Sequence, residues 1–312
     1  MSFVPEELIN LFENENSLED NQKDLIEKDL ILHKILMNLS SNKEFKENYA
    51  FKGGTCLTKA YFGYYRFSEN LDFSFIKQQK FKGMSKNKIR KEISKELEKI
   101  IKVINKFCKE NNLNFEDNKS NEEYFEFRAG NKFTTIKIYY NSSIDNTKRF
   151  IKIQFNFLEK ILFNLEERET ENLVWKGKGF KEGFNLPEGF EWVLKSPVLK
   201  VYSLEEILSE KIRAILTRGG VKERDFIDIY KITSGDINKF RKIKKEIIVK
   251  TTFMLNYKRY YENLLAHQKE IPEYSGGEEK LMIEKLPEGF YSFLPELKEF
   301  LKEIIPKIIN KD

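Results

Sequence analysis

The sequence predicts an α+β fold in which a mixed region of strands and helices precedes a helical C-terminal part. Residues 5–17 and 22–39 have apolar side chains at helical spacing, and helical spacing returns from Ser203 to the end. Most of the strand-like segments lie between these regions, from Leu71 to Phe157. This order predicts an α/β domain of residues 1–200, which includes the N-terminal helices, and a helical domain of residues 201–312.

The composition is typical of a soluble globular protein, with 40% hydrophobic and 34% charged residues among 312. The net charge of +5 permits a polyanionic partner such as RNA, but a lysine-rich surface is the simpler explanation. Two cysteines and two histidines are too few for a thiolate metal cage or a histidine-rich metal site. The sequence has no apolar run long enough to cross a bilayer, and its first 25 residues are acidic and polar. We therefore expect a cytoplasmic protein with no membrane partner.

Further elements follow from local periodicity. The helix at 22–39 is expected to be capped by Asp20 or Asn21, and a short helix is expected at Leu57–Tyr65, after a pair of glycines. A long, basic, amphipathic helix is predicted at 85–112, whereas 165–195 is poor in strand signals. The predicted strands are Leu71–Ile76, Tyr124–Arg128, Thr134–Tyr140 and Phe150–Phe157.

A pair of glycines separates the strand-like "NYAFK" from the helix that follows. Gly53 and Gly54 leave backbone N–H groups free to point outward, and a helix N-terminus adds partial positive charge. Together with the hydroxyl of Thr55 these groups form a candidate site for phosphate oxygens. An ordinary tight turn is the alternative explanation.

An aspartate in the next strand supports the first explanation. In the strand Leu71–Ile76, Asn70, Asp72 and Ser74 share the face opposite the core. A carboxylate near a glycine turn can hold a divalent cation against a triphosphate, because Mg²⁺ prefers carboxylate and phosphate oxygens.

A second cluster of charged residues lies in the helical part. Lys211 falls on the apolar stripe of its helix, where a buried ammonium needs an anion, either a phosphate or a structural carboxylate. The alternative is that its side chain extends to solvent. Asp225 and Asp228 lie one turn apart on the next helix. Asp225 is the better catalytic candidate, since it could accept a proton from an attacking hydroxyl or orient Lys211. A basic rim surrounds these residues and consists of Arg218, Lys222 and Arg224.

Four segments carry a resemblance to a known family. They are "EKDLILHKIL" (27–36), "FKGGTCLTKAY" (51–61), "RFSENLDFSF" (66–75) and "SLEEILSEKIRAILTRGGVKERDFIDIYKI" (203–232). In order and spacing the chain resembles the AbiEii/AbiGii-type nucleotidyltransferase toxins of abortive-infection toxin–antitoxin systems, within the DNA polymerase β-like superfamily. The resemblance covers about residues 20–235 and implies a polymerase β-like core with a mixed sheet, completed by the helical domain.

The resemblance also implies roles for individual residues. Mg²⁺ would be bound by Asp72, with the amide of Asn70 beside it, and Lys211 would neutralise triphosphate charge. Asp225 and Asp228 would complete the site. The residues implied to contact the nucleotide are Gly53, Gly54, Thr55, Arg66, Ser68, Arg218, Arg224 and Asp228.

The sequence departs from the family pattern at the metal site. The family usually has "SEDLD" where this chain has "SENLD", so Asn70 replaces a carboxylate with an amide. The strand expected to add a third carboxylate offers Gln154 and Asn156, also amides. Glu159 lies beyond the alternating stretch and receives little weight as a ligand. Metal affinity is therefore expected to be lower than in the family.

The predicted function is transfer of an NMP from an NTP to an acceptor hydroxyl. The resemblance implies the tRNA 3′ end as acceptor, a toxin role, and an antitoxin encoded nearby. One alternative is a protein that binds nucleotide or RNA without chemistry, for which the missing carboxylates argue. Another is a nucleotidyltransferase acting on a protein or a small molecule.

Overall fold

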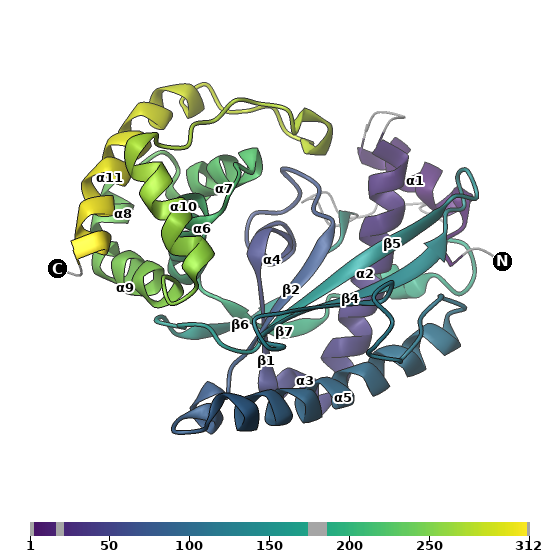
Figure 1. Cartoon of the computed structure of the whole chain (residues 1–312). Helices are drawn as coiled ribbons and strands as arrows, with labels where there is room; N and C mark the ends of the chain where they lie inside the picture. The colour runs from purple at the N-terminus through teal and green to yellow at the C-terminus, as the bar shows by residue number, and fades with distance from the viewer. Residues whose placement is uncertain (1–2, 17–21, 174–185, 311–312) are drawn as a thin grey trace. The chain divides into compact units, whose positions relative to one another are not determined.

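The computed structural model describes residues 3–16, 22–173 and 186–310 (Figure 1). The chain divides into two compact units. The first contains the residues up to Glu159 together with Leu165–Val201, and the second contains Lys160–Asn164 and the residues from Tyr202 onward. The first unit is built around a sheet and the second around helices, so the predicted α+β class is confirmed.

The sheet has seven strands in the order β3-β4-β5-β2-β1-β7-β6. It is mixed, because β2 pairs with β5 and β1 with β7 in parallel, whereas β1–β2, β3–β4 and β4–β5 are antiparallel. The strands are β1 (Tyr49–Lys52), β2 (Asn70–Phe75), β3 (Phe125–Arg128), β4 (Phe133–Asn141), β5 (Lys148–Asn156), β6 (Leu165–Glu169) and β7 (Val198–Tyr202). The mixed sheet is therefore present as predicted.

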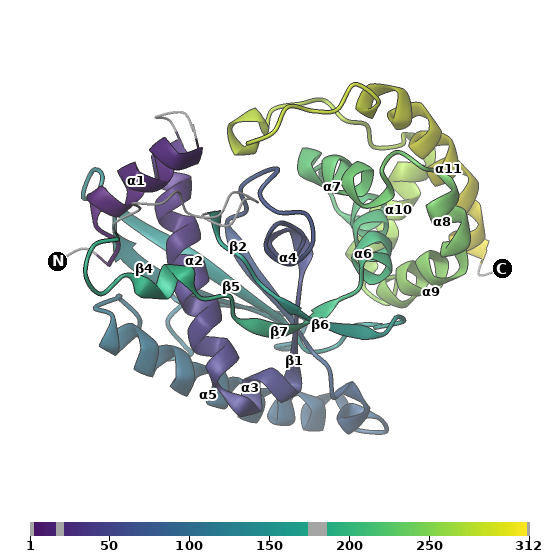
Figure 2. The same ribbon diagram turned by 180° about the vertical axis from the view of Figure 1, so that it is seen from behind.

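Helices cover the apolar face of this sheet. Phe73 and Phe155 stack on neighbouring strands, and Phe45 of α3 packs edge-on against Phe73, 5.0 Å between centroids. The basic helix α5 buries the apolar stripe that the sequence predicted, from Ile93 to Ile104. Figures 1 and 2 show α3 and α5 on one side of the sheet and α4 on the other. The helices of this unit are α1 (Glu6–Asn16), α2 (Lys23–Ser41), α3 (Lys43–Asn48), α4 (Gly53–Ala60) and α5 (Lys86–Glu110).

Three local expectations need correction or fall outside the structure. The helix expected at Leu57–Tyr65 is α4, which begins at Gly53, because the positive φ of 77° at Gly53 turns the chain directly from β1 into the helix. The segment expected to be poor in strands contains β6, which pairs at the sheet edge. The proposed caps Asp20 and Asn21 lie outside the described residues.

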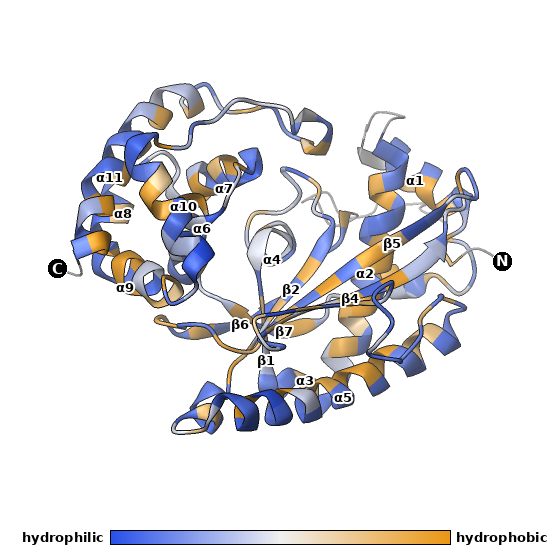
Figure 3. Cartoon of the chain, viewed as in Figure 1, coloured by the Kyte–Doolittle hydropathy of each residue, from blue (hydrophilic) through white to orange (hydrophobic). Residues whose placement is uncertain are grey.

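The second unit is a bundle of helices. α6 packs against α7, α9 and α10, and α11 packs against α7, α9 and α10. α10 carries both hydrophilic and hydrophobic residues (Figure 3). In the described part of the chain, no helix is long and apolar enough to span a membrane. The helices are α6 (Leu204–Thr217), α7 (Glu223–Thr233), α8 (Asn238–Lys242), α9 (Lys244–Met254), α10 (Lys258–Lys269) and α11 (Phe290–Asn310).

The second unit also contains the segment Lys160–Asn164, which follows β5 in the chain. The carboxylate of Glu206 accepts hydrogen bonds from the backbone N–H groups of Leu162 and Phe163, both 2.8 Å long. The buried ammonium of Lys250 pairs with the same carboxylate. Buried charges are stable only when they are paired in this way, so the segment is held firmly against α6.

Candidate active site

A row of polar residues crosses the sheet on the face opposite the phenylalanines. The register pairs Lys52 with Asp72, Asp72 with Gln154, and Gln154 with Thr135. Residues paired in register point to the same face, so this row alternates with the buried apolar rows. The sequence predicted that Asp72 would face away from the core, and the structure places it there, partly exposed.

Asp72 lies against the first residue of α4. A Cβ atom added at Gly53 would stand 2.7 Å from Oδ2 of Asp72, closer than van der Waals contact allows. Only glycine leaves room for the carboxylate here, and only glycine adopts the φ of 77° without strain. The acidic side chain therefore lies at the positive N-terminal end of α4.

Arg66 supplies a positive charge beside the second glycine. Its side chain is almost completely buried, and Nη1 donates a 2.8 Å hydrogen bond to the carbonyl oxygen of Phe67. Nη2 is the atom that a side chain at Gly54 would strike first. The guanidinium thus lies against the glycine turn, which the sequence predicts to be a phosphate site.

The hydroxyl groups of Thr55 and Ser68 connect the glycine turn to the start of β2. Oγ1 of Thr55 lies 2.6 Å from Oγ of Ser68 and also donates to the carbonyl oxygen of Asn70. Thr55 is buried. These contacts position α4 against the start of β2, while a direct contact of Thr55 or Ser68 with phosphate stays a prediction.

Glu159, which received little weight as a metal ligand, is the carboxylate that pairs with Lys52. Its Oε2 accepts hydrogen bonds from Lys52 (2.7 Å), Ser74 (2.8 Å) and Asn156 (2.7 Å), and its side chain is buried. The sequence contained one signal for this pairing, a lysine immediately before the glycine pair, because a buried ammonium requires an anion. Glu159 therefore lies on the Asp72 face of the sheet and neutralises Lys52, the residue that precedes Gly53.

The donors around Asp72 suit a hard cation but bring little charge. The described residues contain no group of three or more histidine, cysteine or acidic side chains arranged to hold a metal. Asn70 and Gln154 place amide groups on the same face as Asp72. One carboxylate and neighbouring amide oxygens fit Mg²⁺ when substrate phosphates supply further oxygens, which is how this ion is usually bound.

In the second unit, Lys211 is the centre of a buried ion cluster. Its Nζ lies 2.6 Å from Oδ1 of Asp225 and 2.6 Å from Oδ2 of Asp228. Nη1 of Arg218 lies 2.5 Å from Oδ2 of Asp225. Burial raises the pKa of Asp225, but the charges of Lys211 and Arg218 outweigh this, and its pKa is lowered overall.

The cluster bears on the predictions for this region. Lys211 lies on the buried face of α6 as predicted, and in the structure its anions are the carboxylates of α7. Arg224 is held by Glu278, which accepts from its backbone N–H at 2.5 Å and lies 3.5 Å from its guanidinium. The phosphate contacts expected of Lys211, Arg218 and Arg224 stay predictions.

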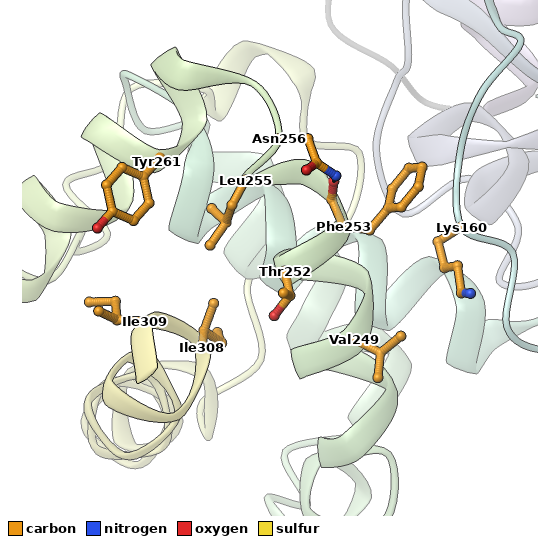
Figure 4. A pocket seen from close by; sticks show the side chains of 9 residues that line it. All are labelled: Lys160, Val249, Thr252, Phe253, Leu255, Asn256, Tyr261, Ile308 and Ile309. Atoms are coloured by element: carbon orange, nitrogen blue, oxygen red, sulfur yellow. The ribbon is translucent and has the colours of Figure 1, made fainter. Parts of the chain in front are cut away.

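A pocket of about 510 Å³ lies elsewhere in the second unit, between α9, α10 and α11 (Figure 4). Its lining is mainly apolar, with Phe253, Leu255, Ile308 and Ile309, and its one charged residue is Lys160. Its lining includes neither a carboxylate nor any predicted site residue. Nucleotide chemistry therefore gains no support from this pocket.

Comparison with known proteins identifies a family. The family model described as "Nucleotidyl transferase AbiEii toxin, Type IV TA system" matches residues 34–306. Among solved structures, JHP933 from Helicobacter pylori is 14% identical, with 90% of this chain and 95% of that chain covered at a TM-score of 0.38. A structure described as a "putative nucleotidyltransferase from H. pylori" is also 14% identical, with 89% and 96% covered at a TM-score of 0.37. A likeness this weak carries no argument. No curated protein matches the chain.

Proposed function

The chain belongs to the AbiEii family of nucleotidyltransferase toxins of type IV toxin–antitoxin systems, and on this premise we propose that it transfers an NMP from an NTP to an acceptor hydroxyl. The proposed acceptor is the 3′ end of tRNA in the cytoplasm, which makes the protein a toxin that stops translation. An antitoxin encoded nearby is the proposed counterpart. The observation that carries this proposal is the contact between Asp72 and Gly53 at the N-terminus of α4.

The first unit would bind the triphosphate. Backbone N–H groups at Gly53 and Gly54, together with the charge of Arg66, favour phosphate oxygens at the start of α4. Asp72, with Asn70 beside it, would hold Mg²⁺. Bound there, Mg²⁺ would supply charge neutralisation on the phosphates. The acceptor hydroxyl loses its proton to solvent and its oxygen bonds to the α-phosphorus, while the bond from that phosphorus to the oxygen bridging the α- and β-phosphates breaks and pyrophosphate leaves.

The second unit would contribute Lys211 to the triphosphate. Of the two roles open to Asp225, positioning of Lys211 has the better support. Asp225 accepts from Lys211 and Arg218, and a lowered pKa makes a carboxylate a weaker proton acceptor. Most of the rate gain would come from positioning and charge neutralisation.

Labelled NTPs test the proposal. Each of the four NTPs, labelled at the α-phosphate, is incubated with the protein, Mg²⁺ and total RNA, and incorporation into RNA is measured. We expect one NTP to label RNA in the tRNA size range, and Asp72→Ala to abolish the label. Asp117→Ala, which removes an exposed aspartate of the same unit, is the matched control. Unchanged labelling by Asp72→Ala would refute the site.

The amides at Asn70, Gln154 and Asn156 favour one rival, a relative that binds nucleotide without transferring it. This rival predicts NTP binding that ignores Mg²⁺, measured by calorimetry, and no pyrophosphate release with RNA or protein acceptors. The remaining alternative is a nucleotidyltransferase that acts on a protein or a small molecule. Mass spectrometry tests it, because the NMP adduct would then be found on that acceptor and not on RNA.

A further inference from the structure

Three aromatic side chains form a row on the open face of the sheet. Tyr139 of β4 pairs in register with Phe150 of β5, and their ring centroids are 5.6 Å apart. Tyr124, directly before β3, lies 5.4 Å from Tyr139. Phe150 is 38% exposed, which is unusual for a phenylalanine. We refer to Tyr124, Tyr139 and Phe150 as the aromatic row.

Lysines accompany these rings. Nζ of Lys148 lies 4.3 Å from the centroid of Tyr139, and Nζ of Lys152 lies 5.3 Å from that of Phe150. Both distances allow cation–π attraction. The face therefore alternates cations with aromatic rings, and proteins that bind single-stranded nucleic acids combine these two features to contact backbone phosphates and bases.

The row is continuous with the face that carries Asp72. Phe150, Lys152 and Gln154 alternate along β5 and so point to one side, and Gln154 pairs in register with Asp72. Gln154 lies four residue steps along the strand from Phe150, or about 13 Å at the usual rise per residue. That length accommodates a few nucleotides of a strand whose end lies at Asp72.

We propose that this sheet face binds single-stranded nucleic acid, with bases stacked on Phe150 and Tyr139 and phosphates beside Lys148 and Lys152. The inference rests on the proposed function and locates its acceptor strand. A duplex is a poorer ligand for this face, because its bases are already stacked and their faces are not accessible.

Neighbouring carboxylates limit the electrostatic part of the binding. Lys148 pairs with Glu123 at 2.7 Å and Lys137 pairs with Glu126 at 2.7 Å. Stacking must therefore supply most of the affinity. With one or two phosphates neutralised, the slope of log K against log salt should be about −0.7 to −1.4. This face is less suited to an apolar protein partner, because such a partner has no anions to pair with the lysines that lie over the rings.

Fluorescence anisotropy without NTP tests the inference. The probe is a fluorescein-labelled single-stranded RNA of twelve nucleotides, compared with the same strand annealed to its complement. We expect the single strand to bind more tightly, Phe150→Leu to weaken it about fivefold or more, and Phe150→Tyr to retain binding. Lys152→Gln should weaken binding and flatten the salt slope. Tyr291→Leu, which removes an aromatic side chain that is 61% exposed in the second unit, is the matched control.

Defined results would overturn the inference. These are equal binding of single strand and duplex, unchanged binding by Phe150→Leu, or no RNA binding by the wild-type protein. Circular dichroism spectra of the variants that match the wild type establish folding. Because the assay contains no NTP, a lack of RNA binding would refute this inference but not the proposal that the protein transfers an NMP to another acceptor. Loss of transfer with intact RNA binding would refute the proposed function instead.

Discussion

The carboxylate of Asp72 lies against Gly53, so close that a Cβ atom on Gly53 would stand 2.7 Å from Oδ2. The two residues are 19 positions apart, yet the antiparallel pairing of β1 and β2 places Lys52 opposite Asp72 and so brings the next residue, Gly53, to the same carboxylate. This pairing brings together the predicted phosphate site at the start of α4 and the predicted metal ligand Asp72.

Gly53→Ala should lower NMP transfer at least tenfold, because the new methyl group would push the Asp72 carboxylate aside. The strain of a positive φ should also cost about 1 kcal/mol of stability. Gly63→Ala is the matched control, since Gly63 has a φ of 67° but open space around its Cβ position. Transfer rates and urea unfolding of both variants are compared. Equal loss of transfer in the two would show that strain, rather than displacement of Asp72, is responsible.

Asn70→Asp should strengthen metal binding, because it restores a second carboxylate on the Asp72 face. We expect the Mg²⁺ concentration for half-maximal transfer to fall about threefold to tenfold, which corresponds to roughly 1 kcal/mol. Asn70→Ser, with a small neutral side chain, should not lower it. A Mg²⁺ requirement unchanged by Asn70→Asp would place the cation away from this position.

Lys211→Met should destabilise the second unit by about 3–5 kcal/mol, because it leaves Asp225 and Asp228 buried without their shared ammonium. The double variant Lys211→Met with Asp228→Asn should recover part of the loss. Lys245→Met, at an exposed lysine, should change the free energy of unfolding by no more than about 0.5 kcal/mol. Urea unfolding measures all three. A loss below about 1 kcal/mol in Lys211→Met would contradict the buried pairing.

His33 should make stability depend on pH between 5 and 7. Burial, together with the charge of Lys59, lowers the pKa of His33 to about 3, from 6.5. Its Nε2 lies 2.8 Å from the carbonyl oxygen of Lys195, and its buried Nδ1 has no hydrogen-bond partner among the described residues. Below pH 6.5 the imidazole of His33 binds a proton in the unfolded chain but stays neutral in the folded protein. The free energy of unfolding is therefore highest above pH 6.5 and falls as the pH decreases, by about 2 kcal/mol at pH 5.

Urea unfolding at pH 7 and pH 5 checks this prediction. His33→Gln should flatten the dependence, whereas His267→Gln, which removes the other histidine, should retain it. The same pH dependence in the wild type and His33→Gln would mean that His33 is not the group responsible.

Much of the fold followed from local patterns. The alternation in β5 and the apolar stripe of α5 are set by residues close in the sequence, so both elements were predicted within a few residues. The start of α4 was not predicted. Paired glycines usually interrupt a helix, but here Gly53 adopts a positive φ and begins one. β6 was missed because its five residues gain their strand structure from pairing at the sheet edge.

The sequence by itself determined the chemical groups of the candidate site and the face on which Asp72 lies, since alternation along a strand is a local property. Only the tertiary structure decided their neighbours. Glu159 reaches Lys52 across 107 positions, and Lys211 finds Asp225 across a turn between two helices. The physical reason is that a buried charge must meet an opposite charge, and which one it meets depends on how distant segments pack together.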